Sequence, residues 1–349
     1  ARTRPAAAPL LSQTPAGISA QSARRLSQAI TRQAAAVPPN YDMRIFQPFV
    51  EEAPSIRFSG TVFSVTYNGK KEIYGAIATH IIPDVPTNPT FGIKRQFEVN
   101  FYQNGLPRIV PAEVVAASPV SVLDIALVKF PAEIEPLLKP YEIGEVLPGK
   151  PLHSVGFNTL GIRPIEKRRI LQQTPASIRT DILVPRKERP GLCGSAVLNA
   201  KGELVGIHTG SISQPYGEED QSFVTPAHYL KALVNSYHNN GIAPVDFYIN
   251  SEHSLPLNAD EHIHSVVLLD AHENILWKHD VIDRFSHSSL EKALKQYPQA
   301  RFVDITAQRI QWTPDGDFLQ RHPHKRISPL RAYVYDLQTK KVISSEELK

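Results

Sequence analysis

The segment from Pro190 to Gly210, PGLCGSAVLNAKGELVGIHTG, contains Cys193, the single cysteine of the 349-residue chain. A thiol becomes an effective nucleophile when a neighbouring imidazole takes its proton, and a carboxylate can orient that imidazole. The developing oxyanion also needs backbone N–H groups, and glycines such as Gly191 and Gly194 let the backbone turn tightly beside the nucleophile. The pattern Gly-Leu-Cys-Gly therefore indicates a nucleophile loop. The alternative is an ordinary buried thiol.

Four segments in sequence order favour the nucleophile loop. They are GAIATHII at 75–82, SVLDIALVKF at 121–130, PGLCGSAV at 190–197 and SFVTPAHYLKAL at 222–233. Together they resemble the histidine, aspartate, nucleophile and C-terminal helix segments of the chymotrypsin-fold (trypsin-like) peptidases, with Cys where most members have Ser. The resemblance covers roughly residues 55–240 and extends to bacterial glutamyl endopeptidases and picornavirus-like cysteine peptidases.

This resemblance implies a role for each matching residue. His80 is the general base and acid, Asp124 orients it, and Cys193 is the nucleophile. The backbone N–H groups of Gly191 and Cys193 form the oxyanion hole. The alternatives are that His80 is a hydrogen-bonded core histidine and that Asp124 is a turn or cap residue.

The resemblance also places His208, Thr209 and Gly210 on the strand that lines the pocket for the substrate residue before the scissile bond. An imidazole can donate a hydrogen bond to a carbonyl or a carboxylate, so we expect cleavage after Gln or Glu. The glutamyl-specific relatives carry Thr or Ser just upstream of the nucleophile loop, whereas this chain has Lys187-Glu188-Arg189-Pro190. The choice between Gln and Glu stays open, and a purely structural His208 is the alternative.

Charge is distributed unevenly along the chain. The formal net charge is +4, but residues 1–40 contain five Arg and no Asp, Glu or Lys, so the remainder sums to −1. A near-neutral folded part argues against nucleic-acid binding, and we interpret basic runs such as Lys167-Arg168-Arg169 as solvated faces. No apolar run approaches the roughly 20 residues of a membrane helix, so no membrane partner is expected.

The predicted fold class is mainly β, with two antiparallel six-stranded β-barrels of chymotrypsin-like type and a small C-terminal α+β domain. Short apolar runs alternate with turn signals from residue 55 onwards, and Asn68-Gly69 and Asn104-Gly105 are hairpin dipeptides. We expect a flexible Ala/Pro/Arg-rich arm or pro-segment at 1–45, the peptidase domain at 46–241 and the accessory domain at 242–349. Within the peptidase domain we expect barrel 1 at about 55–135, barrel 2 at about 145–226 and a helix at 226–240 that Pro226 begins.

The accessory domain contains weaker signals. His262 and His264 could share a strand face and ligate zinc, but two histidines are a weak signal, so we expect neither a metal nor another cofactor. This domain could hold a protein partner, and a peptidase-like module that binds peptides without cleaving them is the alternative function. The start at Ala1 fits an exported protein after signal removal; a viral polyprotein product or an intracellular protein are the alternatives.

Overall fold

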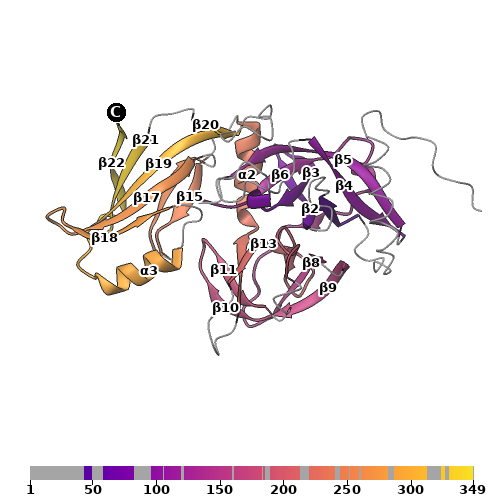
Figure 1. Ribbon diagram of the computed structural model, residues 1–349, viewed down its shortest axis with the longest axis horizontal. Coiled ribbons are helices and arrows are strands. Elements are labelled where there is room, and N and C mark those ends of the chain that lie inside the picture. Colours follow the sequence, from indigo (N-terminus) through magenta and orange to yellow (C-terminus); the bar gives the residue numbers. More distant parts are fainter. Residues whose placement is uncertain are drawn as a thin grey trace, which may run out of the picture.

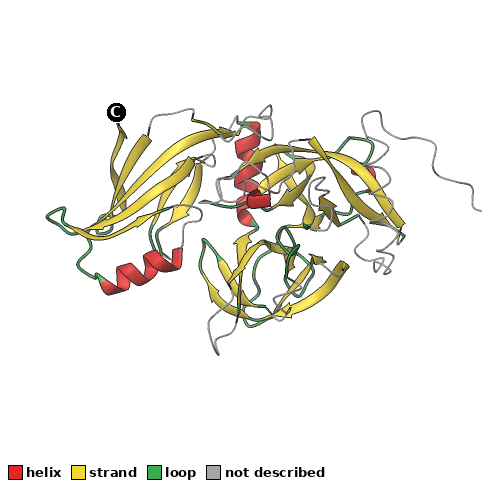
Figure 2. Ribbon diagram, in the orientation of Figure 1, coloured by secondary structure: helices red, strands yellow, loops and turns green. Residues whose placement is uncertain are grey.

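The computed structural model of the chain describes residues 43–48, 58–81, 96–104, 106–118, 122–158, 161–182, 184, 189–212, 220–239, 244–250, 252–258, 261–281, 287–312, 324–326 and 330–348. Strands dominate this part of the chain, and its α-helices are α2 (His228–His238) and α3 (His287–Gln296) (Figure 2). The predicted arm lies almost entirely outside the described residues. No described helix has both the length and the apolar character needed to cross a membrane.

The first barrel is a closed antiparallel sheet. Its strands are β1 (Ile45–Pro48), β2 (Gly60–Tyr67), β3 (Lys70–Ile77), β4 (Gln96–Gln103), β5 (Leu106–Ala117) and β6 (Ala126–Lys129). They pair in the order β1-β4-β5-β6-β3-β2, and pairing of β1 with β2 closes the ring. A short strand, β7 (Tyr141–Glu142), adds to β2 in parallel. Strand β1 precedes the segment from which the sequence predicted this barrel.

Turn residues explain the barrel's hairpins. Asn68 (φ 46°) and Gly69 (φ 78°) connect β2 to β3, and this pair of positive φ angles suits the tight turn of a twisted hairpin. Asn104 (φ 52°) similarly follows β4, which pairs with β5. Both predicted hairpins are confirmed.

The second barrel is nearly closed. Its strands are β8 (Leu152–Asn158), β9 (Gly161–Arg168), β10 (Ile170–Gln173), β11 (Ile178–Asp181), β12 (Ala196–Leu198), β13 (Leu204–Ile212) and β14 (Gln221–Pro226). Their order is β10-β11-β14-β13-β12-β8-β9, and a single residue separates β9 from β10 at the two ends of that order. Two successive antiparallel barrels followed by a helix constitute the chymotrypsin-like fold that the sequence predicted.

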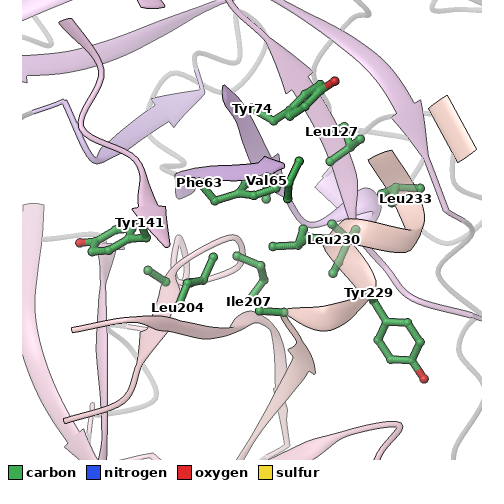
Figure 3. Close-up of a cluster of buried hydrophobic side chains, with 14 of the residues drawn as sticks. Phe63, Val65, Tyr74, Leu127, Tyr141, Leu204, Ile207, Tyr229, Leu230 and Leu233 are labelled. Atoms are coloured by element: carbon green, nitrogen blue, oxygen red, sulfur yellow. The ribbon is translucent and has the colours of Figure 1, made fainter. Parts of the chain in front are cut away.

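A buried apolar cluster joins the barrels and α2. Phe63 and Leu127 reach it from barrel 1, Leu204 and Ile207 from barrel 2, and Leu230 from α2, and each of these side chains is fully buried (Figure 3). Removing this much apolar surface from water on both barrels holds them at a fixed mutual orientation. That orientation matters because the predicted catalytic residues come from both barrels.

The C-terminal region forms an α+β fold, as predicted. Its elements are β15 (Pro244–Tyr248), β16 (Ser254–Asn258), β17 (Glu261–Leu269), β18 (Ile275–Asp280), α3, β19 (Phe302–Trp312), β20 (His324–Arg326), β21 (Leu330–Asp336) and β22 (Lys341–Leu348). A sheet of order β18-β17-β19-β21-β22 packs with α3 and the β15–β16 hairpin around its own core. Figure 1 shows α2 between this region and barrel 1.

The C-terminal region also touches the peptidase core directly. Val245 of β15 belongs to the inter-barrel cluster, and Tyr229 Oη of α2 donates to the Asp246 carbonyl at 3.1 Å. Val122, two residues before Asp124, packs against both the inter-barrel cluster and the C-terminal core. The accessory fold is therefore attached close to the predicted catalytic aspartate.

The helix boundary differs slightly from the prediction. Pro226 is the last residue of β14, where it lies opposite Gly206, and α2 begins at His228. Proline cannot donate to a ladder, so it suits the end of a strand as well as the start of a helix. In the C-terminal region, β17 and β18 pair as an antiparallel hairpin, and α3 follows them in the chain.

Candidate active site

His80 and Asp124 meet at the ends of two paired strands. Strand β3 pairs with β6 so that Ile77 lies opposite Ala126, and continuing this register brings the residues after Ile77 beside those before Ala126. His80 follows β3 in the short 3-10 segment η2 (Thr79–Ile81). Its Nδ1 lies 2.9 Å from Asp124 Oδ2 and 3.1 Å from Oδ1, and its backbone N–H donates to Oδ1 at 2.9 Å.

Asp124 is held in an unusual backbone conformation. Its φ is 54°, in the left-handed region that only a few per cent of non-glycine residues occupy, with Asp enriched among them. Its side chain is 1 % exposed, and its carbonyl accepts the N–H of Thr79 at 3.2 Å. Strain of this kind is concentrated at functional sites, where surrounding contacts over-determine the conformation.

The electrostatics of His80 suit a general base. Burial lowers the pKa of the imidazole, but electrostatic interactions with Asp124 and Cys193, together with side-chain hydrogen bonds to both, raise it by a larger amount. The net pKa lies well above the usual 6.5. Because one ring contacts both partners, the structure unites the three residues that the sequence singled out.

Cys193 lies in a tight turn that depends on its two neighbouring glycines. Gly191 has φ 100° and Gly194 has φ 91°, both in the region that favours glycine. A Cβ at Gly194 would also fall 1.8 Å from the Ser59 carbonyl oxygen. The Leu192 carbonyl accepts the Ser195 N–H at 2.9 Å and closes the turn around Cys193, whose side chain is partly exposed.

The backbone donors predicted for the oxyanion hole have no acceptor among the described residues. Neither the Gly191 N–H nor the Cys193 N–H donates a hydrogen bond to any other group in the described part of the chain. The neighbouring N–H groups differ: that of Leu192 donates to the Arg189 carbonyl, and that of Gly194 donates to the His208 carbonyl. The two predicted donors are thus the ones that a developing oxyanion could engage.

Ser59, which the sequence analysis did not identify, holds the nucleophile loop across the barrel interface. Its Oγ donates to the Gly191 carbonyl at 2.7 Å and accepts the Phe157 N–H at 2.7 Å. Its backbone N–H donates to the Cys193 carbonyl at 3.0 Å, and Ser195 Oγ lies 3.2 Å from its hydroxyl. No local signal marks Ser59, because its partners are about a hundred residues away or more in sequence.

His208 lies inside barrel 2 and is 1 % exposed. Its Nδ1 lies 2.6 Å from Ser222 Oγ and 3.1 Å from Arg168 Nη1, and that guanidinium nitrogen also donates to Ser222 Oγ at 2.7 Å. Arg168 is itself 0 % exposed. Our interpretation of Lys167-Arg168-Arg169 as a solvated face is wrong for Arg168, because strand alternation turns this one residue inward between two exposed neighbours.

Thr209 and Gly210 lie at a bulge in β13. The pairing with β14 shifts between His208 and Gly210, which leaves Thr209 as the extra residue. Thr209 Oγ1 lies 3.2 Å from Thr225 Oγ1, and Thr225 in turn donates to the Leu123 carbonyl at 2.9 Å. Thr209 therefore links the predicted substrate strand to the turn that carries Asp124, a connection that the sequence did not suggest.

The residues upstream of the nucleophile loop are partly described. Arg189 hydrogen-bonds Asp220 and donates to the Val184 carbonyl at 2.8 Å, so its guanidinium is engaged in fixing the loop. Lys187 and Glu188 lie outside the described residues.

In the C-terminal sheet, the rings of His262 and His264 lie 4.8 Å apart, and the described residues contain no group of three ligands that could hold a metal ion.

Comparisons with known proteins give the fold a limited context. No protein-family model matches the sequence, and no curated protein matches it. Among solved structures, the protease domain of MamO from Magnetospirillum magneticum aligns at 20 % identity over 56 % of this chain and 96 % of that chain, with a TM-score of 0.40. The serine endoprotease from Yersinia pestis aligns at 18 % identity over 93 % and 98 %, with a TM-score of 0.42. Sequence identities of 20 % or less and TM-scores near 0.4 do not assign a function to this chain.

Proposed function

We propose that the protein is a cysteine endopeptidase that uses His80, Asp124 and Cys193 and cleaves after Gln or Glu. One observation carries the proposal: a single imidazole contacts the Asp124 carboxylate through Nδ1, and interactions with both Asp124 and Cys193 raise its pKa. A general base must reach the nucleophile while a third group orients it, and this arrangement meets both requirements. The two partners come from different barrels, as in the family that the sequence resembles.

The arrangement supports an acyl-transfer mechanism. His80 takes the thiol proton, and the Cys193 thiolate attacks the scissile carbonyl carbon to form a tetrahedral intermediate. The intermediate collapses when the C–N bond breaks and His80 returns the proton to the leaving amine. A water molecule, deprotonated by His80, then attacks the thioester, and the thiolate departs with release of the new carboxylate. Asp124 holds the imidazole orientation and stabilises the imidazolium throughout.

The nucleophile loop supplies the stabilisation of the oxyanion. The N–H groups of Gly191 and Cys193 have no other acceptor within the described residues. Ser59 fixes the orientation of Gly191 through a hydrogen bond to the Gly191 carbonyl. Donors held rigidly before the reaction stabilise the intermediate without reorganising. Ser59 thus serves as a positioning residue for the oxyanion hole.

Strand β13 provides a surface for the substrate backbone. Its pairing with β12 covers Leu204–Ile207, and beyond this β13 continues past His208 along β14. A peptide can add to such a strand edge through its main chain, next to the nucleophile loop. His208 on the same strand would then meet the side chain that precedes the scissile bond, and an imidazole N–H suits the side-chain oxygen of Gln or Glu.

The first experiment measures the rate of Cys193 alkylation by iodoacetamide against pH in the wild type, in His80→Ala and in His228→Ala. His228 is an exposed histidine of α2 and serves as the matched control. We expect rapid alkylation of the wild type and of His228→Ala well below the ordinary thiol pKa of about 8.5, and loss of this reactivity in His80→Ala. Slow alkylation that rises only near that pKa in all three proteins would instead support an inert peptide-binding module.

The substrate class needs a second measurement. Peptides that differ only in the residue before the scissile bond, with Gln, Glu, Leu or Lys at that position, would be incubated with the wild type and with Cys193→Ala. We expect cleavage after Gln or Glu by the wild type alone, detected by mass spectrometry. Equal cleavage after Leu would rule out the proposed role of His208, and cleavage by Cys193→Ala would rule out the proposed nucleophile.

A further inference from the structure

The interior of barrel 2 contains a fully buried cation next to the predicted substrate pocket. Among the described side chains that are almost completely buried, that of Arg168 is the largest. It ends strand β9, whereas His208 and Ser222 lie on β13 and β14, so the cluster joins three strands. Buried charges are retained in proteins when they are engaged by polar partners, and Arg168 contacts both a hydroxyl and an imidazole.

The direction of these hydrogen bonds follows from the donor inventory. A guanidinium has N–H donors and no acceptor, and it stays protonated in proteins. Because Arg168 Nη1 lies 3.1 Å from His208 Nδ1, a proton on that ring nitrogen would face another N–H. Ser222 Oγ accepts from Arg168 at 2.7 Å, and its own proton is then directed to Nδ1 at 2.6 Å. Nδ1 is thus an acceptor, and the ring proton resides on Nε2.

We propose that Arg168, together with Ser222, is a positioning residue that holds His208 in its neutral Nε2–H tautomer, so that the pocket selects a substrate side chain ending in an acceptor oxygen. This inference deepens the proposed function and rests on it for its meaning in catalysis. A neutral Nε2–H offers one donor. It matches the carbonyl of Gln or a carboxylate oxygen of Glu, and it offers nothing to Lys or Arg.

A purely structural role for Arg168 makes different predictions. An arginine that only ties β9 to β13 and β14 would affect folding stability, and any loss of activity would be equal for all substrates. A positioning residue changes which ring nitrogen of His208 carries the proton. The tautomer is therefore the decisive observable, and it can be measured without catalysis.

The test measures imidazole 15N chemical shifts at neutral pH in protein labelled at histidine, with the His208 signal assigned by its loss in His208→Gln. We expect the Nε2–H pattern in the wild type and in Arg168→Lys, which retains a cationic donor. We expect an appreciable Nδ1–H population in Arg168→Met, which has similar length and no donor. Arg301→Met, which removes an ion pair with Asp336 in the C-terminal sheet, is the control and should leave the pattern unchanged.

Peptide hydrolysis links the tautomer to specificity. Arg168→Met should lower kcat/KM for the Gln and Glu peptides by roughly 10- to 100-fold, with the Leu peptide and the Cys193 alkylation rate unchanged. An equal loss on all peptides, or wild-type kinetics and tautomer in Arg168→Met, would overturn the proposal. An Nδ1–H tautomer in the wild type would overturn it even if Arg168→Met failed to fold. If the proposed peptidase function itself is wrong, the wild type will show neither rapid Cys193 alkylation nor peptide hydrolysis, which is distinguishable from failure of the Arg168 proposal.

Discussion

His80 and His208 are the same kind of side chain in opposite electrostatic settings, the first on barrel 1 and the second inside barrel 2. The Nδ1 of His80 faces the Asp124 carboxylate, so it donates a proton, and the negative charges around the ring raise its pKa. The Nδ1 of His208 faces a hydroxyl and the Arg168 guanidinium, so it accepts. The first setting favours a ring that gains and loses a proton, and the second favours a fixed donor.

The comparison shows that the group behind a histidine decides what the histidine can do. Both rings present Nε2 to their working side in our proposals, towards Cys193 in one case and towards the substrate side chain in the other. An anion behind the ring stabilises the imidazolium that proton transfer creates, whereas a cation behind the ring opposes it. Residue type alone does not distinguish the two roles.

Asp124→Asn should have the largest effect, because it removes the anion that faces Nδ1 of His80. We expect peptide hydrolysis to fall by about 10³-fold or more, because the amide no longer holds the imidazole in the tautomer that accepts the thiol proton. Asp336→Asn is the matched control, since Asp336 is also a buried, ion-paired aspartate but lies in the C-terminal sheet. Comparable losses in both variants would show that Asp124 acts only through stability.

Ser59→Ala should disturb the surroundings of both His80 and His208, because Ser59 holds the nucleophile loop that lies between them. The variant leaves the Gly191 carbonyl and the Phe157 N–H without their shared buried partner. We expect the free energy of unfolding in urea to fall by about 1–3 kcal/mol and hydrolysis to fall by roughly 10-fold or more. Ser118→Ala is the control: Ser118 is buried, and its Oγ has no hydrogen-bond partner within the described residues. Activity unchanged in Ser59→Ala would show that the oxyanion donors are held by other contacts.

Folding stability should report the raised pKa of His80. A group whose pKa is higher in the folded than in the unfolded state contributes stability below its unfolded pKa, and this contribution is lost as the pH rises through the folded value. We therefore expect the urea-unfolding difference between the wild type and His80→Gln to be largest below about pH 6.5 and to shrink above it. A difference that instead grows with pH would contradict the charge assignment at His80.

Val122→Ala should have the smallest effect, because Val122 contacts neither histidine directly and lies close to Asp124 only in sequence. Val122 packs between the inter-barrel cluster and the C-terminal core, two residues before Asp124. We expect a loss of about 1 kcal/mol in stability and a few-fold loss in hydrolysis, with the preference for Gln and Glu unchanged. Val115→Ala is the control, since Val115 packs against the inter-barrel cluster only. Equal activity losses in the two variants would exclude a specific link between the C-terminal region and Asp124.

Local patterns were sufficient where the physics is local. The turn from β2 to β3 follows from Asn68-Gly69, because these residues tolerate positive φ. His80, Asp124 and Cys193 were recognisable because each lies in a short segment that resembles the corresponding segment of the chymotrypsin-fold peptidases: His80 follows β3, Asp124 precedes β6 and Cys193 precedes β12. By contrast, β1 lies in a segment without alternation, and Pro226 carried a signal compatible with two kinds of element.

Most barrel strands and their main turns, β1 excepted, were predictable from the sequence, because they depend on neighbours within a few positions, and the resemblance to the chymotrypsin-fold peptidases indicated the three residues of the proposed catalytic group. The contacts that surround each functional side chain depend instead on the tertiary structure. Ser59 contacts Gly191 across 132 positions, and Arg168 reaches His208 across 40 and Ser222 across 54. Barrel closure and strand order bring such pairs together, and the charge that each histidine meets is therefore a property of the fold.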